Sequence, residues 1–563
     1  MNFQAILSPE RITDLTRRGL WINRLICDLL DEAAARTPDA PAIVEYRNST
    51  GQTTRISYRE LRELSIRIAA ALAGLGVQRQ DVVSIQLPNW WHFAAVHAAC
   101  VRIGAVVNPL MPIFRERELE FMLGFAGSRV LIVAQEYRGF DYPAMAARLR
   151  PLLPALAHVL VVNGNDPASA FESVVLNRAW ETETDTSALF AARRPGPNDV
   201  TEIMYTSGTT GQPKGVMHTA NTLMCKATLA NELFGFRADD AIFMGSPMAH
   251  QTGFMYAAVL SIFNATKCVL QEAWEPAGAA ALIEQERCTI TLGSTPFLND
   301  LVHAPAMRAA DLSSLRLFLC AGAPIPGVLV EEAAQRFPQL YVMSAWGMTE
   351  MGIATATYPG DAPEKVFGTD GRALPHQEVR VVDADGQPVP PGVEGRLQAR
   401  CVTLFVGYLK RPADYGVDEA LWCETGDNAR MDADGYIRIT GRSKDLIIRG
   451  GENIPVVEVE SLIHRHPAVE DCAIVGMPDV RLGERGCAFV TLRPETSLDF
   501  TGLLDFLRDA GLIKPYWPER LEVLDAFPRT PSGKIQKFRL REMAATLTPM
   551  TAPPKTQEER SLT

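Results

Sequence analysis

Residues 205–216 read Tyr-Thr-Ser-Gly-Thr-Thr-Gly-Gln-Pro-Lys-Gly-Val. This run of glycines and small hydroxyl residues contains a single lysine. Glycine lets backbone N–H groups converge on an anion, while hydroxyls and a lysine add further donors. The pattern therefore predicts a loop that holds a polyphosphate. Its expected binding residues are Thr206, Ser207, Gly208, Thr209, Thr210 and Lys214.

A Walker loop and a plain flexible loop are the alternatives for this segment. A Walker loop needs a glycine, four residues and then Gly-Lys-Ser/Thr, but here Pro213 precedes the lysine and Gly215 follows it. The order of the whole run disfavours an unspecialised loop. The run resembles instead the signature loop of adenylate-forming enzymes, the superfamily of acyl-CoA synthetases, firefly-luciferase-like enzymes and the adenylation domains of peptide synthetases.

Length, charge and cysteine usage exclude several classes of protein. The 563 residues, 47% of them hydrophobic, exceed what one core usually serves, so we expect two or more domains. A net charge of −11 without a basic stripe argues against nucleic acid as a partner. We find neither a long apolar span nor a signal peptide, and the ten cysteines lack zinc spacing. We therefore expect reduced, mostly buried thiols in a cytoplasmic protein without integral membrane association.

The pattern of apolar residues changes twice along the chain. Runs such as 82–87 and 130–133 alternate with helical patterns such as 58–75, which predicts parallel βαβ units. From about residue 368, short strands and turns predict a smaller antiparallel region. From near Lys444 the pattern predicts a compact α+β unit.

The resemblance implies the same plan as an α/β fold. A large N-terminal adenylate-forming domain, residues 1–443, would combine stacked mixed α/β sheets with a small antiparallel β region. A small mobile α+β domain, residues 444–545, would follow and carry the catalytic lysine. Residues 546–563 have little to bury, and we expect them to be disordered.

A second motif, residues 344–350, combines an aromatic ring, a glycine, a hydroxyl and a carboxylate in Trp346, Gly347, Thr349 and Glu350. In the family that it resembles, the aromatic residue flanks adenine, the threonine contacts the α-phosphate and the glutamate helps to hold Mg²⁺. One carboxylate plus nucleotide phosphates suits Mg²⁺, which prefers oxygen ligands and keeps much of its water. The family more often has tyrosine at the aromatic position; a purely structural segment is the alternative.

Two further segments complete the expected nucleotide site. By resemblance, the turn Gly322-Ala323-Pro324 lies along the adenine, Asp427 binds the ribose and Arg442 assists it. A carboxylate can accept hydrogen bonds from both ribose hydroxyls. Residues 432–435 could belong to an EF-hand loop or a β-turn, and we favour the turn because further acidic ligands are missing.

The C-terminal part supplies a hinge, a channel and a lysine by the same resemblance. Lys444 occupies the hinge between the two domains, and Gly450 and Gly451 line the pantetheine channel, although an ordinary hairpin turn is the alternative for the glycines. Lys534, in a Ser-Gly-Lys loop, matches the catalytic lysine of the family.

The acyl segment begins at His250, which would separate the acyl pocket from the nucleotide and which we include with Thr349, Glu350 and Lys534 among the catalytic residues. Amino-acid-activating relatives usually carry aspartate where this chain has Gln251. The neighbouring residues are apolar, and Gly293 is expected to leave space for the acyl group. A hydrophobic acid, alicyclic such as cyclohexanecarboxylate or medium-chain, is therefore the expected substrate, with aryl acids second.

The resemblance implies an acid–thiol ligase. The acid would react with Mg-ATP to give acyl-AMP and pyrophosphate, and coenzyme A would then displace AMP. An acyl-AMP ligase that loads a carrier protein, a luciferase-like oxygenase and a non-catalytic nucleotide-binding relative are the alternatives. The sequence leaves the oligomeric state open between a monomer and a homodimer.

Overall fold

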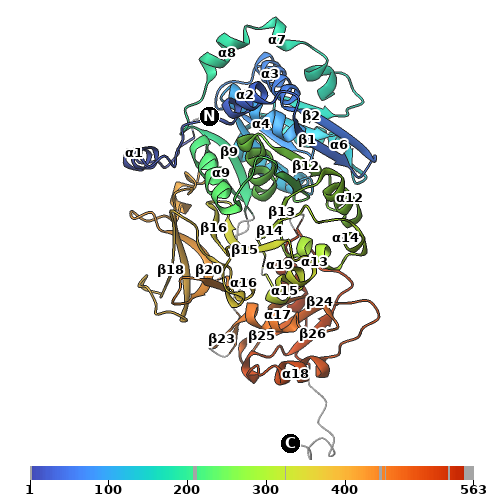
Figure 1. Cartoon of the computed structure of the whole chain (residues 1–563), viewed down its shortest axis with the longest axis vertical. Helices are drawn as coiled ribbons and strands as arrows, with labels where there is room; N and C mark the ends of the chain where they lie inside the picture. Colours follow the sequence, from blue (N-terminus) through green and yellow to red (C-terminus); the bar gives the residue numbers. More distant parts are fainter. Residues whose placement is uncertain are drawn as a thin grey trace, which may run out of the picture.

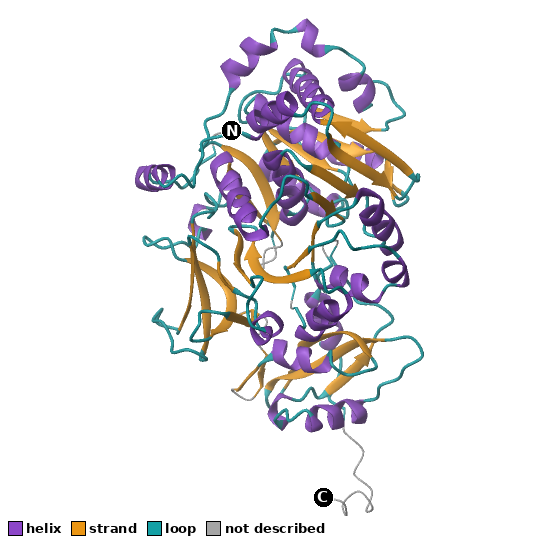
Figure 2. Ribbon diagram, in the orientation of Figure 1, coloured by secondary structure: helices purple, strands orange, loops and turns teal. Residues whose placement is uncertain are grey.

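The computed structural model describes residues 3–206, 212–323, 325–442, 447–449, 452–530 and 533–550, without the side chains of residues 448, 452 and 453. Two large sheets lie in the upper part of Figure 1, a smaller sheet lies beside them, and the C-terminal part lies below. Helices cover and separate the large sheets (Figure 2).

The first large sheet has nine strands in the order β17-β16-β15-β14-β13-β11-β12-β1-β2. Six strands, from β15 to β1 in this order, run parallel. The pairings β1–β2, β15–β16 and β16–β17 are antiparallel. The strands are β1 (Pro41–Arg47), β2 (Gln52–Ser57), β11 (Ala241–Met244), β12 (Lys267–Gln271), β13 (Ile290–Gly293), β14 (Leu317–Cys320), β15 (Tyr341–Met348), β16 (Gly352–Ala356) and β17 (Arg372–Ala373). Helices α12 (Pro276–Glu286), α13 (Thr295–His303), α14 (Pro305–Ala309) and α15 (Gly327–Arg336) connect the parallel strands. The predicted βαβ units are thus confirmed.

The second large sheet has six strands in the order β10-β9-β4-β3-β5-β8, all parallel except β10. They are β3 (Val82–Gln86), β4 (Val106–Pro109), β5 (Ser128–Ala134), β8 (His158–Val162), β9 (Val200–Thr206) and β10 (Lys214–Thr219). The apolar run in β5 suits a strand that is buried on both faces. Helices α3 (Tyr58–Gly74), α4 (His92–Arg102), α5 (Glu116–Ala126) and α6 (Tyr142–Leu149) belong to this part of the chain.

One continuous core joins the two large sheets, because it contains strand residues from both, such as Val83 and Leu319. All residues of α4 are buried. Helix α9 (Ala220–Phe234) contacts β10 of one sheet and β16 of the other. Buried helices therefore fill the space between the sheets, and α9 directly follows β10, the strand after residues 207–211.

The small sheet is antiparallel in the order β18-β19-β20-β21, as predicted. Its strands are β18 (Gln377–Val382), β19 (Glu394–Cys401), β20 (Cys423–Met431) and β21 (Ile437–Arg442). Its apolar residues pack on Trp346 from the second motif and on Met351, which follows that motif. This packing brings β20 and β21 to the end of β15.

The C-terminal part has its own sheet and core. The sheet contains β22 (Ile447–Arg449), β23 (Glu452–Ile454), β24 (Val469–Asp479), β25 (Gly483–Leu492) and β26 (Arg520–Val523). Its helices are α17 (Val456–Ile463), α18 (Phe500–Asp509) and α19 (Lys537–Ala544). Ile463, Leu503 and Leu507 meet in the core of this part, which fits the predicted α+β unit.

Shorter elements complete the described chain. They are α1 (Pro9–Arg17), α2 (Ile26–Arg36), β6 (Glu136–Tyr137), β7 (Phe140–Asp141), η1 (Arg150–Leu152), η2 (Glu172–Leu176), α7 (Trp180–Glu183), α8 (Thr186–Arg193), α10 (Gln251–Gly253), η3 (Phe254–Val259), α11 (Leu260–Asn264), α16 (Pro363–Gly368), η4 (Pro412–Asp414) and η5 (Lys514–Tyr516). Within the described ranges, no helix has the length and apolar character that a membrane crossing requires.

Candidate active site

Eight of the predicted site residues lie outside the described residues: Ser207, Gly208, Thr209, Thr210, Pro324, Lys444, Gly450 and Gly451. Segments that are described flank each of them. Residues 207–211 join the antiparallel strands β9 and β10, and Gly450 and Gly451 join β22 and β23. Strands β22 and β23, which flank Gly450 and Gly451, pair as a hairpin. The role of the two glycines in a pantetheine channel stays a prediction.

Thr206 and Lys214 form the base of the phosphate-loop segment. They face each other in the β9–β10 register. The ammonium of Lys214 lies 3.1 Å from a carboxylate oxygen of Asp414 and 4.8 Å from the centre of the Tyr408 ring. This partner was not predicted, because Asp414 lies far along the chain. The Asp414 carboxylate thus holds the ammonium of Lys214, and bound phosphates would compete with Asp414 for that ammonium.

Glu350 lies in the turn between β15 and β16 and is 6% exposed. The Tyr408 hydroxyl donates to Oε1 of Glu350 at 2.7 Å, and the Phe405 N–H donates to its carbonyl at 2.7 Å. Burial, followed by the charge of Glu350, raises the pKa of Tyr408, so this phenol stays a donor. The carboxylate is therefore fixed through one oxygen.

The Glu350 carboxylate fits a magnesium ion that is bound together with a nucleotide. In the described part of the chain, no three His, Cys, Asp or Glu side chains gather as a metal site. Mg²⁺ is commonly bound by one or two carboxylates plus substrate phosphates and water rather than by a cage of protein ligands. A single buried carboxylate is the kind of protein ligand that such an ion needs.

Trp346, Asp427 and Arg442 form one connected group. The indole N–H of Trp346 donates to Oδ2 of Asp427 at 2.9 Å, and Nε of Arg442 lies 3.1 Å from Oδ1. Asp427 on β20 pairs in register with Arg442 on β21. Asp427 is 5% exposed and Trp346 is 8% exposed. The indole donor was not anticipated, and it orients the carboxylate that we predict to bind the ribose.

Lys534 reaches this group from the far end of the chain. A Cβ on Gly322 would lie 3.5 Å from Cε and 4.0 Å from Nζ of Lys534, so the lysine ends against the Gly322 turn. Removal from water and then the charge of Arg442 lower the pKa of Lys534 to about 8, while Asp427 and Glu350 oppose this shift. The structure therefore brings together Lys534, Glu350, Asp427, Arg442 and Gly322.

The glycine before the lysine allows this approach. Gly533 has φ +85°, and a Cβ there would lie 2.6 Å from Oγ of Ser294 and 3.3 Å from Cγ of Pro296 at the start of α13. A side chain at this position would be strained by the backbone and crowded by the large domain. Gly533 thus lets the segment that carries Lys534 pack closely on Ser294 and Pro296.

His250 begins the acyl segment and caps α10, where its Nδ1 accepts from the Thr252 N–H at 3.2 Å. Removal from water and then the charge of Lys534 lower the pKa of His250 to about 4, so the imidazole is neutral. Phe254 and Met255 follow and are buried. His250 is therefore near enough to Lys534 to sense its charge and is followed by apolar residues, and its role as a divider stays a prediction.

The expectation for Gly293 is wrong. A Cβ at Gly293 would lie 2.8 Å from Cβ and 3.0 Å from Cγ of Phe297. The missing side chain therefore makes room for Phe297 from the next helix and not for an acyl group. Sequence reasoning missed this because Phe297 lies one helical turn beyond the strand and folds back onto it.

Other expectations from the sequence hold. All ten cysteines are buried and unpaired. Residues 432–435 form a turn in which the Gly435 N–H donates to the Asp432 carbonyl at 3.1 Å. Lys365 lies 2.6 Å from Asp432 and 2.7 Å from Asp434, so these carboxylates serve an ion pair.

Sequence reasoning missed a buried polar cluster beneath the second motif. Glu202 on β9, His218 on β10, Lys226 on α9 and Gln251 on α10 are all at most 4% exposed. Each stands in an otherwise apolar stretch. That isolation was the available signal, but only the fold shows that the four side chains meet.

The fold and the site define an adenylate-forming ligase. The sequence model described as AMP-binding enzyme matches residues 30–409, and that described as AMP-binding enzyme C-terminal domain matches residues 458–534. The chain belongs to the AMP-binding enzyme family, which confirms the resemblance seen in its motifs.

Relatives in this family match nearly the whole chain. The medium-chain fatty-acid–CoA ligase of Escherichia coli (strain K12) is 34% identical over 96% of this chain and 94% of its own length. The 2,3-dihydroxybenzoate-AMP ligase of Bacillus subtilis (strain 168) is 32% identical over 95% of this chain and 96% of its own.

Solved structures agree with the fold. The anthranilate CoA ligase AuaEII in complex with anthranoyl-AMP superposes with a TM-score of 0.83 at 25% identity, covering 93% of this chain and 98% of that one. ATP-bound MatB from Rhodopseudomonas palustris gives a TM-score of 0.78 at 26% identity, covering 92% and 98%.

Proposed function

We propose that this enzyme joins a hydrophobic carboxylic acid to coenzyme A in two steps driven by Mg-ATP, with alicyclic or medium-chain acids as the first substrate class. The observation that carries this proposal is the convergence of Lys534 with Glu350, Asp427 and the Gly322 turn. A cation from the C-terminal part meets carboxylates and a glycine turn from the middle of the chain, where a nucleotide would fit.

In the first step, a carboxylate oxygen of the acid forms a bond to the α-phosphorus of ATP, and the bond to pyrophosphate breaks. Negative charge grows on the α-phosphoryl oxygens, where Lys534 and Thr349 would stabilise it. Lys214 and the loop at 207–211 would hold the leaving pyrophosphate. A magnesium ion held by Glu350 would neutralise part of the phosphate charge when bound.

The nucleoside would lie between the Gly322-Ala323 turn and Trp346-Gly347, with its ribose on Asp427 and Arg442. Asp427 already accepts a hydrogen bond at Oδ2 and pairs with Arg442 at Oδ1, and carboxylate oxygens have further lone pairs for the ribose hydroxyls. Neutral His250 would separate this nucleoside from the acyl group without adding charge to either substrate.

In the second step, we propose that residues 444–545 move as a domain about Lys444 relative to residues 1–443. Lys534 would leave and the turn at Gly450-Gly451 would guide the pantetheine arm, so that the thiol displaces AMP from the acyl group. Residues 546–563 would form a tail outside both domains. We place the enzyme in the cytoplasm because ten buried, unpaired cysteines suit a reducing compartment.

An aryl acid is the second candidate substrate, and transfer to a carrier protein is the second candidate outcome. The likeness to a 2,3-dihydroxybenzoate-AMP ligase supports both. Phe297, which fills the space beside Gly293, favours a compact acyl group over an extended one.

The test is pyrophosphate release with Mg-ATP across cyclohexanecarboxylate, straight-chain acids of rising length, benzoates and amino acids, followed by thioester detection with coenzyme A. Release with alicyclic or medium-chain acids and formation of the thioester would support the proposal. Release without thioester would indicate another acceptor. Release only with benzoates would move the substrate to the aryl class.

A further inference from the structure

The ammonium of Lys226 contacts three separate segments. Its Nζ lies 2.9 Å from Nε2 of His218, 3.3 Å from the carbonyl oxygen of Thr349 and 3.1 Å from the amide oxygen of Gln251. The amide orientation is assigned from its partners, because the amide nitrogen then donates to Oε1 of Glu202 at 3.1 Å. The Thr349 carbonyl and the Gln251 amide both accept from this ammonium, so Lys226 joins the turn after β15 to α10.

His218 adds a second contact to the same carbonyl. Its Nε2 lies 2.8 Å from the Thr349 carbonyl oxygen and 2.9 Å from Nζ of Lys226, and its Nδ1 lies 3.1 Å from Oγ1 of Thr222. Burial, and then the charge of Lys226, lower the pKa of His218 and keep the ring neutral. The imidazole and the ammonium therefore meet at the Thr349 carbonyl.

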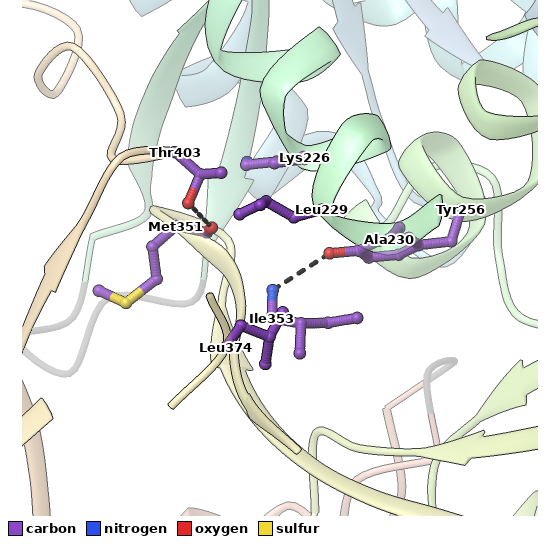
Figure 3. Close-up of a pocket in the computed structure, with 8 residues that line it drawn as sticks. All are labelled: Lys226, Leu229, Ala230, Tyr256, Met351, Ile353, Leu374 and Thr403. Atoms are coloured by element: carbon purple, nitrogen blue, oxygen red, sulfur yellow. Dashed lines mark hydrogen bonds between the residues drawn. The ribbon is translucent and has the colours of Figure 1, made fainter. Parts of the chain in front are cut away.

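The carbonyl that Lys226 holds belongs to the turn with Thr349 and Glu350. On its other side, the Phe405 N–H donates to the Glu350 carbonyl, and the Thr403 hydroxyl donates to the Met351 carbonyl at 2.6 Å. Figure 3 shows Lys226 and Thr403 on the two sides of a small cavity next to Met351. The turn is thus fixed from both sides, by α9 and by the segment after β19.

A glycine lets the lysine pass close to this turn. Gly352 has φ +73°, and a Cβ there would lie 2.9 Å from the Tyr256 hydroxyl and 3.2 Å from Cδ of Lys226. The stem of Lys226 therefore packs directly against the backbone that follows Glu350.

We propose that Lys226 is a positioning residue that ties the Thr349–Glu350 turn to the acyl segment at Gln251, and so aligns the nucleotide with the acid for adenylation. This inference rests on the proposed function and adds a residue to it. Glu202 balances the charge of Lys226 through the amide of Gln251. Burial raises the pKa of Glu202 and lowers that of Lys226, and each charge opposes the shift of the other.

A structural lysine and a positioning lysine differ in one measurable respect. Lys226→Met alone leaves Glu202 buried without its counter-charge, which costs stability whatever the role of the lysine. The double variant Glu202→Gln/Lys226→Met removes both charges and keeps both shapes. If the lysine only balances charge, the double variant recovers both stability and rate; if it positions the turn, stability returns and the rate does not.

The experiment measures single-turnover acyl-AMP formation, thioester formation from supplied acyl-AMP, the Kd of Mg-ATP by calorimetry and Tm. For the double variant we expect a Tm near that of the wild type, an adenylation rate about 10- to 100-fold lower, a weaker Mg-ATP Kd and a thioester step changed less than about threefold. Wild-type adenylation and Mg-ATP affinity in the double variant would overturn the proposal.

The chain offers a matched control in Lys267 and Glu286. Nζ of Lys267 lies 2.8 Å from a carboxylate oxygen of Glu286, at the edge of β12. Glu286→Gln/Lys267→Met makes the same pair of substitutions outside the site. Glu286 also pairs with Arg55, which is 59% exposed and can be solvated when the carboxylate is lost, so we expect this variant to leave adenylation unchanged. If the wild type releases no pyrophosphate with any acid, the proposed function fails, and the Mg-ATP Kd of the double variant then decides the role of Lys226 alone.

Discussion

We expect the positive charge of Lys534 to determine the rate of the proposed first step. Its pKa of about 8 follows from removal from water and the nearby Arg442. A cation on the α-phosphate is worth most in a site that excludes water. We therefore expect Lys534→Gln to lower adenylation about 100- to 1,000-fold at neutral pH, and to leave thioester formation from supplied acyl-AMP within about threefold.

The same residue sets the sign of the pH dependence. Lys534 is charged below its pKa, so kcat/KM for pyrophosphate release should be level near neutral pH and fall as pH rises through about 8. Lys534→Arg keeps its charge far above this range, so its slower rate should show no such fall. The measurement is the pH profile of wild type and both variants; an unchanged fall in Lys534→Gln would assign the titration to another group.

Several site residues could be read from the sequence because they belong to continuous motifs. Trp346, Glu350 and Lys534 each stand among neighbours that identify them. The contacts that tune them could not be read this way. The indole donor to Asp427 and the Asp414 partner of Lys214 both link residues more than 80 positions apart, and no local pattern encodes such a pair.

At the scale of elements, strands and helices followed from apolar periodicity with small shifts at their ends. The run at 130–133 lies inside β5, and the pattern at 58–75 matches α3, whose start is fixed by reciprocal hydrogen bonds between Ser57 and Glu60. The error at Gly293 concerns how two elements pack. Gly293 ends β13, and the expectation did not consider that Phe297 on the following helix, α13, packs against this glycine.

The short helix α10 illustrates how close packing limits an element. Gly253 lies in α10, and a Cβ there would lie 2.3 Å from the carbonyl oxygen of Pro247. Backbone cannot yield as a flexible side chain can. We expect Gly253→Ala to destabilise the protein by about 2 kcal/mol or more and to reduce turnover by displacing His250.

Thermal unfolding and steady-state turnover of the purified variant test this expectation. Gly124→Ala is its control, because Gly124 lies in α5 and the nearest atom to a Cβ there is a leucine methyl at 3.4 Å. Alanine in that helix should be neutral or slightly stabilising. Equal losses in both variants would mean that α10 tolerates a side chain.

At the scale of the whole molecule, the order of the motifs along the chain predicted that distant segments would meet, but not how. Strands β9 and β15, the small sheet and the C-terminal part each contribute one side of the site. Lys226 on the buried helix α9 links two of these parts, because it contacts His218 on β10, which pairs with β9, and the Thr349 carbonyl after β15. Which segments share a buried helix depends on topology, and a single sequence does not reveal it.

The docking of the C-terminal part on α13 makes a prediction at this largest scale. Gly533→Ala would place a methyl group 2.6 Å from Oγ of Ser294, and the loop that carries Lys534 would have to withdraw from the large domain. Because only adenylation needs Lys534 in place in the proposed mechanism, we expect that step to slow about tenfold or more while thioester formation from supplied acyl-AMP keeps its rate.

The control for this prediction is Gly511→Ala, which introduces the same backbone strain, at φ +79°, but meets no atom within 4 Å. Single-turnover rates of both steps in the two variants separate strain from docking: equal effects on adenylation would assign the loss to the backbone, and a loss confined to Gly533→Ala would assign it to the contact between the domains.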